Sequence, residues 1–137
     1  MFNLFEKIKE YVRILDEIRN DSNLYIITQD ELDVCNEKGS SLRSPNCPNC
    51  GSWKNHWETL SRIKDPVLCS NLDCCKTATV GGHVVFADAK TGRKFIIPLC
   101  ESCNGKSSDE VYTIRKGTIM VSANCKDTCD KLNNQSL

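Results

Sequence analysis

Cys100-Glu101-Ser102-Cys103-Asn104-Gly105 and Cys47-Pro48-Asn49-Cys50-Gly51 are the two stretches that decide the fold. In each stretch two residues separate the cysteines, and this spacing lets both thiolates reach one metal ion. A glycine follows closely after each pair, and glycine accepts backbone angles that other residues resist. Because the chain shows no secretion signal, the two pairs predict structural Zn2+ sites, with disulfides as the alternative.

A third cysteine pair is looser and consists of Cys69 with Cys74 or Cys75. Adjacent residues project in different directions, so we expect only one of the last two to bind, and we choose Cys74. Apolar, β-branched stretches at residues 79–86 and 94–97 flank a turn-like segment and predict a β-hairpin. This hairpin would bring the loop before it next to the loop after it. The predicted all-thiolate site consists of Cys69, Cys74, Cys100 and Cys103.

The pair Cys47 and Cys50 needs two more ligands, because a structural zinc site is tetrahedral. We assign His56 and Cys129 to it, with Cys125 as a substitute for Cys129. His56 lies in Trp53-Lys54-Asn55-His56-Trp57, so a packing histidine is the open alternative to a ligand. Cys35 we expect to be a buried small hydrophobic residue. The sequence therefore predicts two zinc ions per chain.

The composition explains why metal is needed. The chain has 137 residues, of which 39% are hydrophobic, and ten of the hydrophobic residues are cysteines. Little aliphatic and aromatic material remains for a core built by burial alone. No apolar run approaches the roughly 18 residues of a membrane span, and no signal peptide is visible at the start. We therefore expect a soluble, cytoplasmic protein without a membrane partner.

Charge divides the chain into two parts. Lys and Arg number 18, as do Asp and Glu, and this balance excludes a uniformly basic protein that coats nucleic acid. Residues 1–39 nevertheless carry a net charge of −4 and residues 40–137 a net charge of +4. A polar stretch with one glycine and two serines joins them. We predict an N-terminal helical segment at 1–39 and a zinc-binding module at 40–137, which deletion of residues 1–39 would leave folded.

The local patterns predict an α+β fold, a small zinc-stabilised module with short β-hairpins. Apolar residues at spacings of three and four predict an amphipathic helix over 2–19, and residues 24–27 read as extended. Thr28 with Glu31 resembles a capping box, which predicts a second short helix that Gly39 would close. Residues 111–114 and 118–121 suggest a second hairpin. The first helix either packs on the zinc-bearing part or forms a homodimer or partner contact.

Residues 69–106 resemble the HNH, or ββα-metal, zinc-finger nucleases, which have a treble-clef zinc frame. The matching pieces are Gly82-His83-Val84 and Ile97-Pro98-Leu99-Cys100-Glu101-Ser102-Cys103-Asn104. The resemblance implies that His83 acts as a general base beside a catalytic divalent ion. Phe95 stands where that family has an asparagine, and Asn104 stands where it has a metal-binding histidine. Residues 47–129 also look like small bacterial proteins of unassigned function.

His83 has three interpretations from its residue chemistry: general base, zinc ligand and structural strand histidine. As a base it would need an ion, for which Asp88 and Asn104 are the nearest candidate ligands. Nothing in their spacing requires such a site. Enzymatic activity is therefore uncertain and disfavoured, and we expect no cleavage of DNA or RNA.

Three functions fit the sequence. The first is a zinc-stabilised, non-catalytic binding module that contacts nucleic acid or a protein partner, with Trp53 and Trp57 stacking on bases or filling the core. The second is a bacterial or phage inhibitor or regulator that uses the N-terminal helix. The third is a metal-dependent HNH-type endonuclease with His83 as base. The basic face of the first would comprise Arg62, Lys64, Lys76, Lys90, Arg93, Lys94, Lys106, Arg115 and Lys116.

Overall fold

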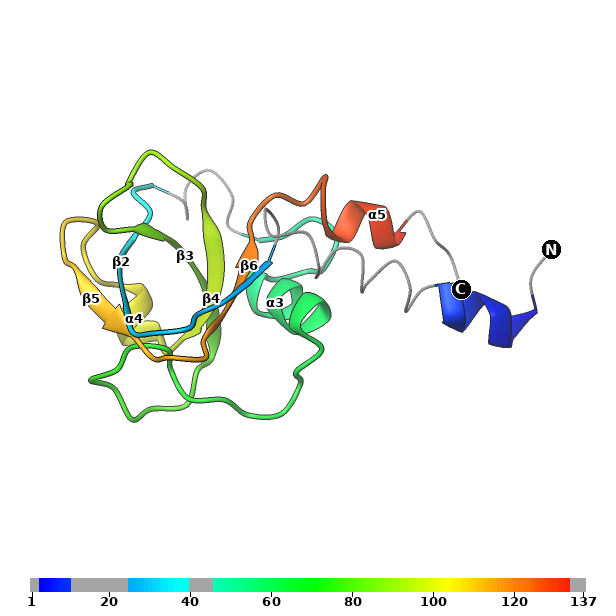
Figure 1. The fold of residues 1–137 in the computed structure, drawn as a ribbon, viewed down its shortest axis with the longest axis horizontal. Helices are drawn as coiled ribbons and strands as arrows, with labels where there is room; N and C mark the ends of the chain where they lie inside the picture. Colours follow the sequence, from blue (N-terminus) through cyan, green and yellow to red (C-terminus); the bar gives the residue numbers. More distant parts are fainter. Residues whose placement is uncertain (1–2, 11–24, 40–45, 134–137) are drawn as a thin grey trace.

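The computed structural model describes residues 3–10, 25–39 and 46–133, and within them it shows a mixed helix and strand fold (Figure 1). Residues 4–10 form a helix. The further elements are β1 (Tyr25–Ile27), β2 (Leu32–Asn36), α3 (Trp53–Ser61), β3 (Val80–Phe86), β4 (Phe95–Leu99), α4 (Glu101–Asn104), β5 (Tyr112–Ile114), β6 (Ile119–Ser122) and α5 (Cys129–Asn133). The predicted α+β class is confirmed in this coarse sense.

All six strands belong to one antiparallel sheet with the order β1-β6-β4-β3-β2-β5. The predicted hairpin of β3 and β4 is confirmed, with Val80 opposite Leu99 and Val84 opposite Phe95. The sheet curls until its two ends approach each other (Figure 1). Thr28, just after β1, accepts the backbone N–H of Gly117 and donates its hydroxyl to the carbonyl of Arg115, just after β5.

The predicted second helix after Thr28 is wrong, because this stretch contains the strand β2. Val34 and Cys35 are fully buried on it, between β3 on one side and β5 on the other. Burial between two strands outweighs a local capping pattern, since sheet pairing satisfies the same backbone groups and also removes apolar surface from water. The expected burial of Cys35 is confirmed.

The predicted second hairpin is also wrong, although both of its strands exist. β5 pairs with β2, whereas β6 pairs with β1 and β4. Between the two strands the chain passes from the edge strand β5 to β6, which lies beside the opposite edge strand β1, through a turn in which Gly117 has φ +84°. The hydrophobic pattern gives the strands, but their partners depend on β1 and β2, which lie far earlier in the chain.

β1 and β2 both precede residue 39, where the sequence suggests a boundary between two parts. The sheet therefore includes strands from both sides of that position. Of the predicted helix over 2–19, residues 4–10 are helical, with the Asn3 side chain accepting the N–H of Glu6 at 2.9 Å. Residues 11–24 lie outside the described residues.

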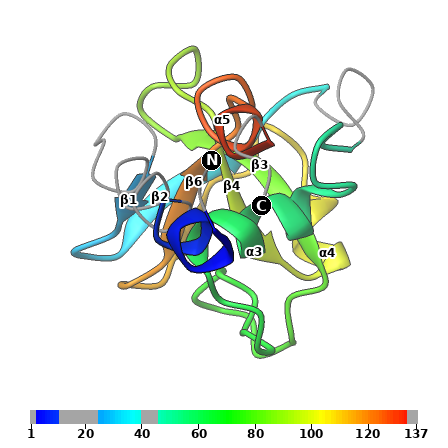
Figure 2. The same cartoon turned by 90° about the vertical axis from the view of Figure 1, so that its right-hand side faces the viewer.

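Helix α3 packs on the sheet near its centre and lies beside α5 (Figures 1 and 2). Ser52 caps its first turn by accepting the N–H of Asn55, and Arg62 ends it in the left-handed conformation. The close approach to β3 needs Gly81, because a Cβ there would lie 2.5 Å from the backbone carbon of Trp53. The sequence patterns did not predict this helix.

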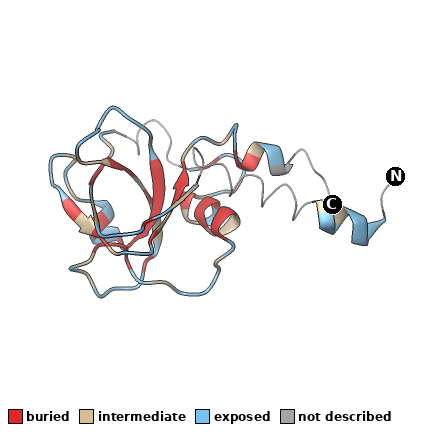
Figure 3. Cartoon of the chain, viewed as in Figure 1, coloured by how far each residue is buried: buried red, intermediate tan, exposed pale blue. Residues whose placement is uncertain are grey.

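Buried residues fill the inside of the curled sheet and its contact with α3 (Figure 3). Trp53 and Trp57 are 7% and 2% exposed and belong to this core. The Trp57 indole N–H donates to the carbonyl of Ile119 at 2.8 Å, so its one polar group is satisfied there. Among the residues that the structure describes, no helix is long and apolar enough to cross a lipid bilayer.

Candidate metal centres

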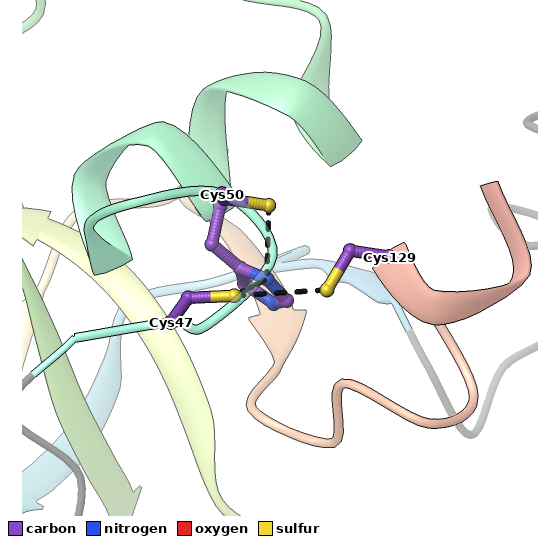
Figure 4. Close-up of side chains that lie close together, drawn as sticks. Cys47, Cys50 and Cys129 are labelled. Carbon is purple, nitrogen blue, oxygen red and sulfur yellow. Dashed lines mark hydrogen bonds between the residues drawn. The ribbon is translucent and has the colours of Figure 1, made fainter. Parts of the chain in front are cut away.

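The first group of ligand atoms joins two distant parts of the chain. Cys47 and Cys50 lie in the loop before α3, and Cys129 begins α5 (Figure 4). In Figure 4 the three sulfur atoms point toward one another. With His56 of α3 they form what we call the first cluster, in which all four ligand atoms lie within 4.8 Å of one another.

The distances within the first cluster suit a tetrahedral ion. The Cys47 sulfur lies 3.6 Å from the Cys129 sulfur and 3.6 Å from Nδ1 of His56, and the Cys50 sulfur lies 3.9 Å from the same nitrogen. Ligand atoms bound to zinc at about 2.0–2.3 Å in a tetrahedron lie about 3.5–3.8 Å apart. A small rearrangement would therefore complete the coordination.

His56 is held in the orientation that a ligand requires. Its Nε2 lies 2.9 Å from the carbonyl oxygen of Ser122, and the side chain is fully buried. A carbonyl oxygen only accepts, so Nε2 carries the proton and the lone pair of Nδ1 faces Cys47. The ring also meets Trp53 edge-on, at 5.1 Å between centroids. Packing and metal binding are thus compatible roles for this histidine.

Hydrogen bonds between the thiols of the first cluster shift their pKa values in opposite directions. A hydrogen bond from Cys50, together with His56, lowers the pKa of Cys129 to about 3. The same hydrogen bond raises the pKa of Cys50 well above its usual range. Clustered thiols cannot all ionise against their mutual repulsion, whereas a divalent cation would remove that obstacle.

The second cluster consists of Cys69, Cys74, Cys100 and Cys103, whose sulfur atoms all lie within 4.8 Å of one another. Cys69 and Cys74 come from the loop before β3, and Cys100 and Cys103 surround the start of α4, after β4. The hairpin therefore brings the two loops together as the sequence predicts. The sulfurs of Cys74 and Cys100 lie 3.8 Å apart. Cys75 is exposed and stands outside the cluster.

Burial dominates the electrostatics of the second cluster. It raises the pKa of Cys69 to about 12 and also raises the pKa of Cys103. Burial acts on Cys100 too, but the Cys103 backbone N–H and the neighbouring thiols outweigh it and lower the pKa of Cys100 to about 7. The first turn of α4 thus stabilises one thiolate, and the remaining thiols need a cation to ionise.

Polar side chains that are not ligands bind the backbone around the second cluster by hydrogen bonds. Nδ2 of Asn36, on β2, lies 3.0–3.1 Å from the carbonyl oxygens of Cys103, Asn104 and Lys106, and its Oδ1 accepts the Tyr112 hydroxyl at 2.6 Å. The sequence patterns did not single out Asn36, because nothing local to it points to residues almost seventy positions later.

Arg115 holds the other side of the second cluster. Its guanidinium donates to the carbonyl oxygens of Cys69 and Cys74. Lys106 forms an ion pair with Glu110 at 2.6 Å, and Lys94 one with Glu37 at 3.8 Å. Arg115, Lys106 and Lys94 therefore have partners within the chain, and Arg93 lies over the Phe95 ring at 4.8 Å. Trp53 and Trp57 are buried, which supports the alternative that they fill the core over stacking on nucleic-acid bases.

His83 lies on β3 and belongs to neither cluster, so the structure does not place it as a ligand with the cysteines. It lines a pocket of about 430 Å³ together with Asn104 and Glu37. Its ring meets Trp53 edge-on at 4.5 Å between centroids. Asp88, the carboxylate suggested by the sequence, lies after β3 and outside the residues that line the pocket.

Glu37, and not Asp88, is the acidic residue that lines the pocket beside His83. It reaches the pocket because β2 pairs with β3, and its backbone N–H donates to the carbonyl of His83 at 2.9 Å. Gly82 leaves room for Asn104, since a Cβ there would lie 2.7 Å from the Asn104 side-chain oxygen. Phe95 is fully buried and acts as a core residue. The sequence analysis did not single out Glu37, because Glu37 precedes residues 69–106, which carry the resemblance to the nucleases.

No protein-family model matches the chain, and no curated protein or solved structure was found to match it. The two clusters of cysteine and histidine side chains are compatible with a zinc-binding module. The resemblance to HNH nucleases rests on the residues quoted for it alone.

Proposed function

We propose that the chain is a zinc-stabilised, non-catalytic interaction module, with one structural zinc ion in each cluster and a protein contact on its N-terminal helix. The observation that carries this proposal is the convergence of two complete sets of four ligand atoms from distant parts of the chain. Tetrahedral sites of four Cys, or of three Cys and one His, without an open position are typical of structural zinc.

The ligands of both clusters tie segments that the sheet alone leaves weakly connected. The first cluster fastens α5 to the loop before α3, and the second fastens the loop before β3 to α4. α4 and α5 have four and five residues, too few to be stable helices on their own. Zinc would therefore contribute directly to the folding of these segments.

The contact surface that we assign is the apolar side of the N-terminal helix. Leu4 and Phe5 are each 67% exposed and Ile8 is 47% exposed, as Figure 3 shows for this helix as a whole. In the sequence the same stripe continues through Val12 and Leu15, so that spacings of three and four alternate. This is the heptad pattern of helices that pack against another helix.

The partner that fits this helix best is a second copy of the same chain. Charges of both signs flank the stripe, namely Glu6, Lys7, Lys9 and Glu10. Two identical helices in antiparallel orientation can pair such charges with one another, whereas a strongly charged partner gains nothing from them. Because the stripe spans fewer than three heptads, we expect a weak dimer.

Sedimentation velocity over a range of concentrations tests the contact. The full chain should show concentration-dependent dimerisation, and a variant with Phe5→Ser and Ile8→Ser should remain monomeric with unchanged zinc content. Lys7→Ser with Lys9→Ser serves as the matched control on the same helix and should retain most of the association. A chain that is monomeric at all concentrations would contradict the dimer. The partner of the N-terminal helix would then be a different protein.

Binding to nucleic acid is the competing function, and the structure removes one support for it. The two tryptophans are buried, and several of the basic side chains have partners within the chain. We expect no salt-dependent retention of DNA or RNA beyond that of a protein with zero net charge. Retention that falls steeply with salt would contradict the proposed protein contact and favour nucleic-acid binding as the function.

The pocket around His83 favours a second candidate, metal-dependent cleavage of a phosphodiester. His83, Asn104 and Glu37 all line this one cavity. A nuclease would need a divalent ion held there beside the base. The first proposal predicts no cleavage with Mg2+, Mn2+ or Ni2+. Cleavage that His83→Ala abolishes, at unchanged zinc content and melting temperature, would establish the nuclease instead.

A further inference from the structure

A pocket of about 290 Å³ lies where α3 meets β6, and none of its lining residues belongs to either cluster or to the pocket around His83. Its walls come from α3, the loop that follows α3, the end of β4 and the turn into β6 (Figure 1). Leu68 is 54% exposed, so apolar surface of this pocket is in contact with water. An apolar group that covered this surface would be stabilised there. The apolar lining residues are Trp57, Ile63, Val67, Leu68, Pro98 and Ile119.

Two basic residues, Arg115 and Lys116, line the same pocket, and among the described residues no Asp or Glu does. The Arg115 guanidinium is anchored, because it donates to the carbonyl oxygens of Cys69 and Cys74. These two bonds leave other N–H groups of its fork for a further acceptor. An anchored guanidinium loses little side-chain freedom when it binds that acceptor. Lys116 is exposed, in the turn before β6. The charge of the pocket is therefore complementary to an anion.

The other side chains of the pocket that can donate hydrogen bonds already do so within the chain. The Ser70 hydroxyl donates to a backbone carbonyl of β4 at 2.7 Å, and the Thr118 hydroxyl donates to a carbonyl in its own turn at 2.6 Å. The Trp57 indole N–H donates to a carbonyl of β6 at 2.8 Å. The two cations are thus the side chains that can offer hydrogen bonds to a ligand. A ligand that fits has an aliphatic group for the walls and a carboxylate for the cations.

We propose that this pocket binds a short acidic peptide segment of a partner protein, with one aliphatic side chain against the apolar walls and a neighbouring carboxylate on Arg115 and Lys116. The pocket is at the lower end of the roughly 300–1,000 Å³ that is usual for ligand pockets, which suits one side chain better than a large cofactor. A peptide also continues beyond the pocket and can cover the exposed Leu68. A small free acid would leave that side chain in water.

Nucleic acid fits this pocket less well than a peptide. Bases bind by stacking on exposed aromatic rings, and the one aromatic residue of the pocket, Trp57, is 2% exposed. Phosphates could contact Arg115 and Lys116, but they carry no aliphatic group for the walls. The inference goes beyond the contact assigned to the N-terminal helix and does not depend on the dimer.

Nuclear magnetic resonance of the zinc-loaded, ¹⁵N-labelled full chain tests the inference with acetyl-Gly-Asp-Leu-Asp-Gly-amide as the probe. The peptide should cause saturable shifts that are largest at the backbone amides around the pocket. A peptide with Asn in place of both Asp residues should bind at least about tenfold more weakly, because it lacks the charge that the cations select. Rising salt should weaken the acidic peptide alone. The amides to follow are those of Leu68, Ser70, Gly117 and Ile119.

Two exposed positions of the pocket supply the variants. Lys116→Glu should lower the affinity for the acidic peptide by about tenfold, since an attraction becomes a repulsion. Lys90→Glu is the matched control, because it makes the same charge change at an exposed residue outside the pocket, and it should bind like the native sequence. Leu68→Ser should lower the affinity by about fivefold through the lost apolar contact. Zinc content and melting temperature should be unchanged in all three. Arg115 is left in place because it also holds the loop of the second cluster.

Three outcomes would overturn the inference. The first is the absence of saturable shifts up to about 5 mM peptide, or shifts that lie elsewhere in the chain. The second is equal affinity of Lys116→Glu and Lys90→Glu for the acidic peptide. The third is a different occupant, shown when 4-methylpentanoate binds as tightly as the peptide or when a single-stranded RNA oligonucleotide shifts the same amides more strongly. If the dimer is absent but the peptide binds as described, the inference holds and the contact assigned to the N-terminal helix fails.

Discussion

Replacement of Asn36 by alanine tests how β2 supports the second cluster. The Asn36 side chain is 7% exposed and connects β2 with the end of α4 and with Tyr112 on β5. Its amide reaches the carbonyls of Cys103, Asn104 and Lys106, and its oxygen accepts the Tyr112 hydroxyl. Alanine removes all of these bonds and leaves buried polar groups without this partner.

The expected loss of stability follows from the number of hydrogen bonds that the Asn36 side chain can make. The Asn36 amide has two hydrogens for three carbonyl acceptors, and the Tyr112 hydroxyl supplies a third hydrogen bond to Asn36. At about 1 kcal/mol for each net hydrogen bond, Asn36→Ala should lower the free energy of unfolding by about 3 kcal/mol. For a chain of this size about 1 kcal/mol shifts the melting temperature by about 4 °C, so the expected decrease is about 12 °C.

The assay is thermal unfolding followed by circular dichroism, with saturating zinc, together with the rate of zinc loss to a chelator. Tyr112→Phe should lower the free energy of unfolding by about 1 kcal/mol, and the double variant should add little to Asn36→Ala, because both remove the same bond. The exposed Lys90→Ala is the control and should change stability by less than about 0.5 kcal/mol. A melting temperature for Asn36→Ala within about 2 °C of the native value would refute this account of β2.

Three further outcomes follow from the same structure. Cys103→Ser, and likewise Cys100→Ser, should abolish the thermal transition, because a structural zinc ion contributes on the order of 10 kcal/mol to folding; a retained transition would show that the second cluster is not a zinc site. Zinc affinity of the second cluster should rise by at least about 100-fold per pH unit between about pH 6 and 8, because burial raises the pKa of Cys69 and of Cys103 and at least these two thiols must lose a proton on binding; a competition titration that gives less than tenfold per unit contradicts this. Deletion of residues 1–39 should give an insoluble chain because it removes β1 and β2, while deletion of residues 1–10 should leave zinc content and melting unchanged; a folded, zinc-loaded product of the longer deletion would show that the sheet tolerates the loss of β2.

The sequence was a better guide to which cysteines lie together than to the pairing of the strands in the sheet. The short Cys-x-x-Cys spacing and one hairpin are local patterns, and together they place Cys69 and Cys74 beside Cys100 and Cys103. Assignment of His56 and Cys129 to Cys47 and Cys50 came from the need for four ligands, and the structure brings those atoms together. Ligand chemistry thus substitutes for distance information that the sequence lacks.

The errors share one cause, which is pairing over long sequence distances. The capping pattern at Thr28 gave way to β2, because β3 and β5 lie on either side of that strand. The second hairpin failed because the strands nearest in sequence, β5 and β6, both have partners elsewhere in the sheet. Glu37 and Asn36 were missed for the same reason, since their roles arise only once β2 has its neighbours.

Two zinc ions with defined ligands are the central claim, and anomalous scattering from crystals of the full chain at the zinc absorption edge tests it most directly. We expect two peaks per chain. One should lie among Cys47, Cys50, Cys129 and Nδ1 of His56, and the other among the four sulfurs of Cys69, Cys74, Cys100 and Cys103. A single peak, no peak, or disulfides in place of either set of ligands would contradict the account.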